Sequence, residues 1–512
     1  MKNMKKLVSV LLTLVMALAL TIPAFATNTT AHTITITNEK SGHTYTAYQV
    51  FAGDITGGKL TNIVWGAGVD GDALLTELKT PESSPYADCN SAEDVAAVLG
   101  GFSNDSAELD AFAKVVGKHL SAAAGSSTQA ASPYTISVAG DGYYFVKDTG
   151  TIGDNDAATK YILQVLDNVK VEAKDEVPEL DKIIIEADDG NDKGTSVDVG
   201  DSVKFQLNSK VPEMDGYDAY TYIVHDTMSN GLTFKNDVAV TIGGLEYTDF
   251  TVVQNGQSFT ITFKNFISQK ENAGKPIVIT YTATLNEAAL ITDKETNTVN
   301  LEYSNDPNAD TTSHTPDKTV YVYDFDIVID KYTGDVATGD RLADAMFVLK
   351  NSEGKYYYWN DTNKKVEWKT VSESDEPVTT DKTPEEIKAA WEALNVTVVK
   401  TDSTGAASFW GLDAGTYALR EIAAPAGYNL LKDDVTVEIT ASYGTDGQIT
   451  SSSATSTNNG QYQQTQPVLN NAGLQLPSTG GIGTTIFYVL GSILVLGAGI
   501  LLVTKKRMSS EK

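Results

Sequence analysis

Alternation of apolar and polar side chains is the sequence feature that most limits how this chain can fold. The segments VKFQL, SFTITF and PIVITYTATL each place apolar residues at every second position. A strand with this pattern buries one face and exposes the other, and turns rich in Gly, Asn, Asp and Ser separate such segments. Because 512 residues exceed the size of one domain, we expect a mainly β protein of about three tandem β-sandwich domains.

Helical patterns are few. The segment SAELDAFAKVVGKHL spaces Leu109, Phe112, Val116 and Leu120 along one face, after a cap at Ser106. The segment TPEEIKAAWEALN predicts a shorter helix, inserted on a loop of the last domain. The first domain is therefore expected to contain some helix.

Both ends of the chain carry export signals. MKNMKK, a short apolar run and PAFA predict a secretory signal peptide over residues 1–26, with cleavage after Ala26. Thr484–Val503 carries no charged residue and reaches the length of about 20 residues that a transmembrane helix needs. Three basic residues follow, so residues 504–512 are expected to be a basic cytoplasmic tail.

Composition narrows the partners. A formal net charge of −29 opposes binding to nucleic acid, which is itself a polyanion. A single cysteine, Cys89, allows no internal disulfide. The five histidines are scattered without ligand spacing, and DGNDKG is expected to be a hairpin turn rather than a calcium loop. We therefore expect no metal and no cofactor, and an exported protein that is stabilised by something other than disulfides.

The pentapeptide LPSTG at Leu476–Gly480 resembles the LPxTG sorting signal of Gram-positive surface proteins. Its position, directly before an apolar run and a basic tail, makes the resemblance specific. The resemblance implies that a sortase, a membrane cysteine transpeptidase, cleaves between Thr479 and Gly480. The carbonyl of Thr479 would then be held as a thioester and passed to an amine.

The segment YILQVLDNVKVEAKDEVPELDK resembles the pilin motif of backbone fimbrial subunits. There a lysine at the end of the first domain attacks the threonyl thioester of the next subunit, and the matching residue is Lys174. The family commonly has Tyr-Pro before this lysine, where this chain has Glu172 and Ala173. The alternatives are a cell-wall peptide as the acceptor and an ordinary linker lysine.

The resemblance covers most of the chain. Residues 27–173 resemble the N-terminal pilin domain, through YTAYQVFAGDI and AGDGYYFVKD. Residues 174–322 resemble the isopeptide-forming second domain of fimbrial subunits, through YIVHDTMSNGLTF and NTVNLEYSNDP. Residues 323–471 resemble the B-type immunoglobulin-like repeat of collagen adhesins, through FDIVIDKYTG and GLDAGTYALREIAAPAGYN.

Both families form spontaneous isopeptide bonds, in which a lysine on the first strand attacks an asparagine on the last and a buried acid catalyses the step. Burial lowers the pKa of the lysine and raises that of the acid, as the reaction needs. The strand GYYFVKD lacks the expected glutamate, so no bond is expected in the first domain. The resemblance implies a bond between Lys182 and Asn297 promoted by Asp226, with Asn300 a poorer candidate, and a bond between Lys331 and Asn470 promoted by Glu421, with Asn471 as an alternative.

Together these features indicate the structural backbone subunit of a covalent Gram-positive pilus, joined from Thr479 to Lys174 and supporting adhesion. The expected partners are pilin-specific and housekeeping sortases, identical subunits, ancillary tip and base pilins, and cell-wall peptidoglycan. The expected location is the cell surface, with a membrane-bound precursor. A monomeric wall-anchored adhesin is the alternative, and an enzyme on a stalk would need a catalytic cluster that the sequence does not display.

Overall fold

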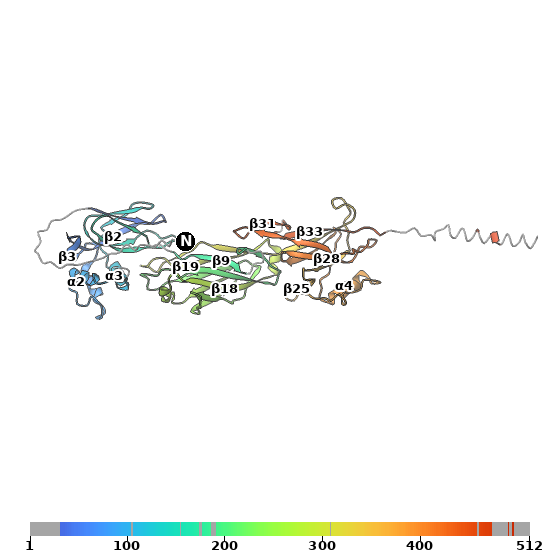
Figure 1. The fold of residues 1–512 in the computed structure, drawn as a ribbon, viewed down its shortest axis with the longest axis horizontal. Helices are drawn as coiled ribbons and strands as arrows, with labels where there is room; N and C mark the ends of the chain where they lie inside the picture. Colours follow the sequence, from blue (N-terminus) through green and yellow to red (C-terminus); the bar gives the residue numbers. More distant parts are fainter. Residues whose placement is uncertain are drawn as a thin grey trace, which may run out of the picture.

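In a computed structural model, the β-sheets fall into three groups that follow one another along the long axis of the molecule (Figure 1). The structure describes residues 31–103, 106–153, 155–173, 177–185, 191–307, 309–457 and 460–473, together with Leu490, Leu494 and Val495. Strands dominate every group, which confirms the expectation of a mainly β protein.

Several predicted segments lie outside the described residues. They are the signal peptide, Lys174, the sorting motif with Thr479 and Gly480, the basic tail, and all but those three residues of the predicted membrane helix. Within the described part of the chain, no helix is long and apolar enough to cross a membrane.

The first group contains a three-stranded and a five-stranded sheet. The predicted alternation holds in its first strand, where Ile34 and Ile36 are fully buried. The three-stranded sheet contains β5 (Tyr134–Val138), β1 (His32–Thr37) and β8 (Val169–Glu172); the five-stranded sheet contains β3 (Lys59–Trp65), β2 (Tyr45–Thr56), β4 (Gly125–Ser126), β6 (Gly142–Asp148) and β7 (Lys160–Val165).

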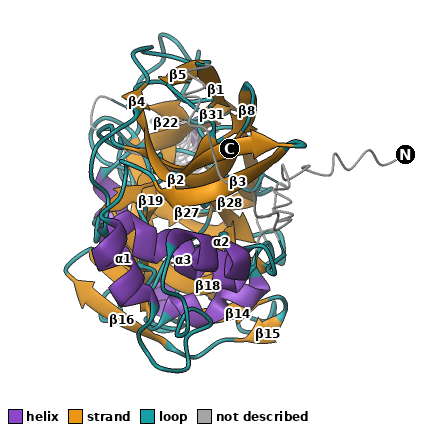
Figure 2. Cartoon of the chain, turned by 90° about the vertical axis from the view of Figure 1, so that its left-hand side faces the viewer, coloured by secondary structure: helices purple, strands orange, loops and turns teal. Residues whose placement is uncertain are grey.

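Three helices gather on one side of this group, α1 (Gly71–Leu78), α2 (Ala92–Leu99) and α3 (Ala107–Lys118) (Figure 2). They share one apolar cluster with β2, β3 and β6. The structure confirms α3 and its cap, since Ser106 accepts a hydrogen bond from the backbone N–H of Leu109. The sequence patterns did not predict α1 and α2, because a helix of 8 residues shows barely two turns of periodicity.

The middle group is a sandwich of two sheets whose facing side chains form one core. Phe259 of one sheet packs edge-on against Tyr281 of the other, with ring centroids 5.1 Å apart. The seven-stranded sheet contains β10 (Gly194–Ser196), β21 (Lys318–Tyr323), β19 (Glu295–Ser304), β20 (Thr312–His314), β12 (Tyr222–Met228), β17 (Ser258–Phe263) and β16 (Phe250–Asn255); the six-stranded sheet contains β15 (Leu245–Glu246), β14 (Ala239–Ile242), β18 (Pro276–Leu285), β13 (Leu232–Phe234), β11 (Ser202–Lys210) and β9 (Leu180–Ile185); two 3-10 helices, η1 (Phe266–Asn272) and η2 (Glu287–Ile291), connect strands.

The third group contains a four-stranded, a six-stranded and a two-stranded sheet. In the sequence, helix α4 (Pro384–Glu392) comes between β25 and β26, as the predicted insertion on a loop of this group. It begins at a capping box formed by Thr383 and Glu386. The sheets contain β27 (Ala406–Leu412), β22 (Phe325–Tyr332), β33 (Tyr462–Leu469) and β32 (Thr455–Ser456); β25 (Lys365–Lys369), β24 (Tyr356–Asn360), β23 (Met346–Lys350), β26 (Val399–Lys400), β28 (Gly415–Ala423) and β29 (Val435–Ile439); and β30 (Ala441–Tyr443) with β31 (Ile449–Ser452).

The chain between β10 and β11 attaches the middle group to the third group. The N–H of Val199 donates to the carbonyl of Gly411 over 2.9 Å, and the N–H of Val366 donates to the carbonyl of Val199 over 2.7 Å. Gly411 has φ +70°, and a Cβ there would lie 2.9 Å from Val199 Cγ2. A single buried core runs through both groups. The two groups are therefore packed against each other and not merely tethered.

Asp198 accepts hydrogen bonds across the contact between the middle and third groups, which we call the joint. Its Oδ2 accepts a hydrogen bond of 2.6 Å from the indole Nε1 of Trp368, and its Oδ1 accepts one of 2.8 Å from the N–H of Asp413. Burial raises the pKa of Asp198, and the two hydrogen bonds offset only part of that rise. Each oxygen of this carboxylate, which is largely removed from water, thus accepts a hydrogen bond from a residue of the third group.

We predict that Trp368→Phe weakens this joint. The ring is kept, but Asp198 loses one donor, and a buried acceptor without its partner costs about 1–3 kcal/mol. Chemical denaturation of the full chain, followed by circular dichroism, measures the loss. Trp359→Phe is the matched control, because its Nε1 donates over 3.1 Å to the exposed Asp361 within one hairpin. Equal losses in the two variants would contradict the role given to Asp198.

Candidate functional site

The first candidate site is a cluster of three buried side chains in the middle group. Lys182 comes from β9 in one sheet, whereas Asp226 and Asn297 come from β12 and β19 in the other. Their exposed fractions are 0%, 1% and 0%. Each residue occupies a buried position of a strand whose side chains alternate between buried and more exposed, as predicted for Asn297. The cluster therefore bridges the two layers of the sandwich.

The hydrogen bonds of the cluster leave the lysine between the acid and the amide. Lys182 Nζ donates to Asp226 Oδ2 over 2.7 Å and also donates to Asn297 Oδ1. Tyr281 from β18 completes the network, since its hydroxyl donates to Asp226 Oδ2 over 2.6 Å and accepts from Asn297 Nδ2 over 3.1 Å. Sequence reasoning placed Tyr281 on the inward face of its strand but gave it no role in the site.

Burial sets the protonation of this cluster. It lowers the pKa of Lys182 to about 8, although Asp226 acts in the opposite direction. Burial also raises the pKa of Asp226, because a carboxylate without water is costly and Lys182 and Tyr281 compensate only in part. The Lys182 ammonium lies 5.6 Å from the ring centroids of both Phe205 and Tyr281. The surroundings thus shift the pKa of the amine down and that of the acid up, each towards its neutral form.

One detail of the sequence prediction is wrong. Asn297 was expected on the last strand of its domain, but β20 and β21 follow β19 in the same sheet. The strand β21 pairs antiparallel with β19, so that Asn297 lies opposite Val320. The alternation within β19 is as predicted, but the segment TVYVYDFD contains β21, which adds a strand to the sheet beyond β19. Asn300, the poorer candidate, faces away from the core and donates to Asp317.

The second candidate site has the same composition in the third group. Lys331 lies on β22, Glu421 lies on β28, and Asn470 directly follows β33. Their exposed fractions are 0%, 5% and 0%. The strands β22 and β33 are parallel neighbours, with Lys331 paired to Val468, and the N–H of Asn470 donates to the carbonyl of Tyr332. The first and last strands of this group therefore lie side by side, as predicted.

Here the acid contacts both reacting partners directly. Lys331 Nζ donates to Asn470 Oδ1 over 2.5 Å and lies 2.9 Å from Glu421 Oε1. Asn470 Nδ2 donates to the same Glu421 oxygen over 3.1 Å, and the N–H of Leu431 donates to the other oxygen over 2.8 Å. Burial lowers the pKa of Lys331, with Glu421 acting in the opposite direction. Asn471, the alternative, is exposed and lies outside this network.

The corresponding strand of the first group carries different chemistry. Asp148 ends β6 and lies with its Oδ2 2.5 Å from Nδ1 of the buried His43. The other ring nitrogen of His43 lies 3.3 Å from Asp156, which is also 3.5 Å from Lys40 Nζ. This is a buried histidine between two acids. The expectation that no isopeptide bond forms in this group stays a prediction.

Three family models match the chain. Residues 199–307 match the Gram-positive pilin backbone subunit 2, Cna-B-like domain. Residues 326–453 match the SpaA prealbumin-like fold domain, and residues 469–510 match the LPXTG cell wall anchor motif. The anchor motif and the pilin domain together identify a cell-wall-anchored extracellular protein.

Two curated relatives match short segments of the chain. Platelet adherence protein A of Streptococcus gordonii is 33% identical over 94 residues, which cover 18% of this chain and 2% of that protein. Fimbrial subunit type 2 of Actinomyces naeslundii is 34% identical over 95 residues, which cover 17% of this chain and 18% of that protein. The matches thus span less than a fifth of either relative.

A solved structure supports the fold over a longer stretch. The T6 backbone pilin of serotype M6 Streptococcus pyogenes, described as a modular three-domain structure, aligns with a TM-score of 0.50. The alignment covers 80% of each chain at 19% sequence identity. At that identity the likeness concerns the fold alone, and it agrees with the three groups of sheets.

Proposed function

We propose that this chain is the structural backbone subunit of a covalently polymerised Gram-positive pilus. The observation that carries the proposal is the occurrence, in one chain, of a pilin backbone domain at 199–307 and an LPXTG anchor motif at 469–510. The anchor motif supplies an acyl donor at the C-terminal end. The in-line arrangement of the sheets supplies an elongated body suited to a stalk (Figure 1). Residues 27–173, 174–322 and 323–471 are the proposed domains of that body.

Polymerisation would proceed by transpeptidation between Thr479 and Lys174. A sortase cysteine attacks the carbonyl of Thr479, the peptide bond to Gly480 breaks, and a thioester forms. The neutral amine of Lys174 from another subunit then attacks the thioester, forms an amide and returns the thiol to the sortase. Because donor and acceptor lie at different places on the subunit, repetition gives an open filament.

The bounds of the flanking strands support the proposed acceptor. The strand β8 ends at Glu172 and β9 begins at Leu180, so Lys174 belongs to the connection between the first and middle groups. Connections between domains are accessible to an enzyme in a way that paired strands are not. Ancillary tip and base pilins, a housekeeping sortase and peptidoglycan would complete the assembly, and the pilus would support adhesion.

We further propose that each buried cluster closes an intramolecular isopeptide bond. The lysine Nζ attacks the asparagine Cγ, the bond from Cγ to Nδ2 breaks, and ammonia leaves with the proton that the amine gives up. The buried acid carries that proton from the amine towards the leaving nitrogen. Proximity enforced by the fold can contribute about 7–11 kcal/mol to such a step, so no separate enzyme is needed. The chain itself is proposed to have no other catalytic activity.

The two clusters would move the proton by different routes. Glu421 contacts both Lys331 Nζ and Asn470 Nδ2, so one carboxyl oxygen can take the proton from the amine and give it to the leaving nitrogen. In the middle group, Tyr281 stands between Asp226 and Asn297 Nδ2. The tyrosine hydroxyl would there relay the proton from the acid to the leaving nitrogen.

The first prediction on function concerns assembly. Lys174→Arg should abolish the ladder of high-mass polymer while monomer still reaches the cell surface, because arginine keeps the charge but lacks a nucleophilic amine at neutral pH. Immunoblots of cell-wall extracts measure the ladder.

Lys170→Arg is the matched control, since Lys170 lies four residues earlier, on β8, and is exposed. It should leave the ladder intact. A full ladder in Lys174→Arg cells would assign the acceptor role to another lysine. A single band from unmodified cells that contain the sortase would favour the monomeric adhesin.

The second prediction concerns mass. Each bond formed by this enforced proximity releases one ammonia, about 17 Da. The intact mass of the processed chain should show two such losses. Asp226→Ala and Glu421→Ala should each abolish one of them, whereas Asp237→Ala, which removes an exposed carboxylate bound to Thr282, should keep both. A mass without losses would refute both assignments.

The third prediction separates Asn470 from its neighbour. Lys331 and Asn470 lie 139 residues apart, and a cross-link closing a loop of this order is worth up to about 4–5 kcal/mol on the loop-entropy model. Asn470→Ala should lower the free energy of unfolding by up to that amount. Asn471→Ala changes an exposed side chain and should cost less than about 0.5 kcal/mol. Differential scanning calorimetry would show the reverse order if Asn471 formed the bond.

A further inference from the structure

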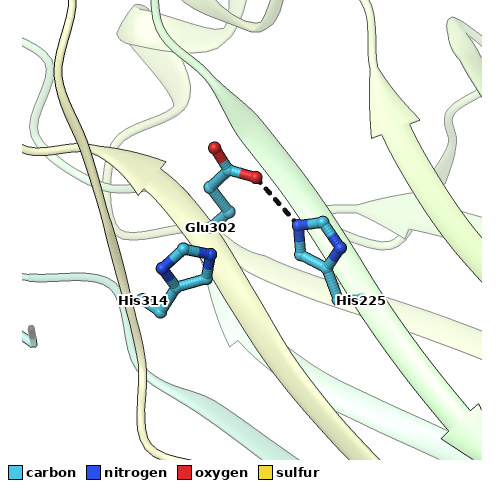
Figure 3. A group of neighbouring side chains, drawn as sticks. All are labelled: His225, Glu302 and His314. Atoms are coloured by element: carbon cyan, nitrogen blue, oxygen red, sulfur yellow. Dashed lines mark hydrogen bonds and ion pairs between the residues drawn. The ribbon is translucent and has the colours of Figure 1, made fainter.

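Three side chains with metal-binding atoms lie close together in the middle group, apart from the cluster of Lys182, Asp226 and Asn297 (Figure 3). His225 comes from β12, Glu302 from β19 and His314 from β20, three strands that are hydrogen-bonded neighbours. Glu302 lies directly opposite His314 in the register. One ligand atom from each residue lies within 4.8 Å of the other two. The histidines looked scattered in the sequence, and pairing of the strands brings these two together.

Hydrogen bonds hold the carboxylate of Glu302 in place beside the two histidines. Its Oε2 lies 2.8 Å from His225 Nε2, while its Oε1 accepts a hydrogen bond of 2.9 Å from the hydroxyl of Thr312. The rings of His225 and His314 have centroids 5.8 Å apart. One oxygen of Glu302 therefore lies against the imidazole of His225, with the ring of His314 nearby.

We propose that His225, Glu302 and His314 bind a divalent transition metal, with Zn²⁺ as the best fit. Two imidazoles and one carboxylate are a ligand set that Zn²⁺ accepts, and three protein ligands leave one position open to solvent. Ligand atoms in a tetrahedral zinc site lie about 3.3 Å apart, so modest side-chain rotations would close the present group. Exposed fractions of 36% for His225 and 22% for Glu302 leave an entry path.

Two neighbours support a metal over a simple ion pair. Thr312 would act as the outer partner that fixes a carboxylate ligand. Asn300 lies opposite His225 in the register, and its buried Oδ1 has no hydrogen-bond partner among the described residues. A water molecule on the open position of the metal would offer that oxygen a donor.

A comparison within the chain shows what an ordinary histidine–glutamate pair looks like. In the first group, His119 Nε2 lies 2.7 Å from Glu77 Oε2, and the other oxygen of Glu77 is paired with Lys118. A cation therefore occupies the place that the hydroxyl of Thr312 takes beside Glu302. The pair of His119 and Glu77 is balanced without a metal and serves as an internal control.

The proposed metal would also tighten the connection to the first group. The carbonyl of His314 accepts a hydrogen bond of 2.8 Å from the N–H of Asn155, and the hydroxyl of Ser313 donates to the carbonyl of Gly153 over 3.0 Å. The strand β20 thus carries two of the contacts from the preceding group. A metal that fastens β20 to β12 and β19 would hold those contacts in place.

Titration of Zn²⁺ into the full chain, stripped of metal by a chelator, tests the proposal. Isothermal titration calorimetry should show one Zn²⁺ per chain, and the melting temperature should rise with Zn²⁺. Thr312→Val should weaken binding by about 10–100-fold through loss of the outer partner. His225→Ala and His314→Ala should weaken it further, and His119→Ala should leave it unchanged.

Two readouts separate a lost ligand from a lost fold. The metal-free melting temperature of His314→Ala should equal that of the unchanged chain, and Co²⁺ in place of Zn²⁺ should give a visible absorption spectrum that disappears in both histidine variants. The proposal is wrong if the unchanged chain takes up no Zn²⁺. It is equally wrong if the variants of His225 and His314 bind Zn²⁺ as tightly as the His119 variant does.

Discussion

A lysine without access to water is the constraint on which the middle and third groups depend. Lys182 and Lys331 are fully buried, and a lone ammonium in such a place costs several kcal/mol. Each lysine therefore needs an acid and an amide oxygen within hydrogen-bonding reach, supplied by other strands. The hydrogen bonds to the lysine therefore hold the strands that carry its partners in one relative position. The same contacts that set up the chemistry of the cluster also fix the packing of the strands.

Much of this was readable from the sequence, because alternation in a strand is a local property. The spacing from Asn297 to Val299 and Leu301 assigns the asparagine to the buried face, and the structure places it there. The capping serine of α3 and the capping box of α4 are equally local. Lys182 and Lys331 are indicated by the resemblance to isopeptide-forming domains rather than by alternation, and the structure buries both.

The rest depends on pairing between distant strands, which alternation does not specify. His225 and Glu302 are 77 residues apart, and only the register of β12 against β19 brings them into contact. Tyr281 was recognised as a core residue, but its hydrogen bonds depend on the opposite sheet. The position of β21 next to β19 likewise depends on how distant strands pair. The two short helices α1 and α2 depend on caps and on packing, and their apolar periodicity is too short to predict them.

The parallel pairing of β22 with β33 has a mechanical consequence. Tension on a filament would enter the third group at β22 and leave beyond Asn470, and with the proposed bond it would pass directly from Lys331 to Asn470. The 138 residues between these two would lie beside the path that bears the load and not along it. Helix α4 and its flanking loops belong to that unloaded loop, so they could change in length and sequence without altering the tensile strength of the fibre.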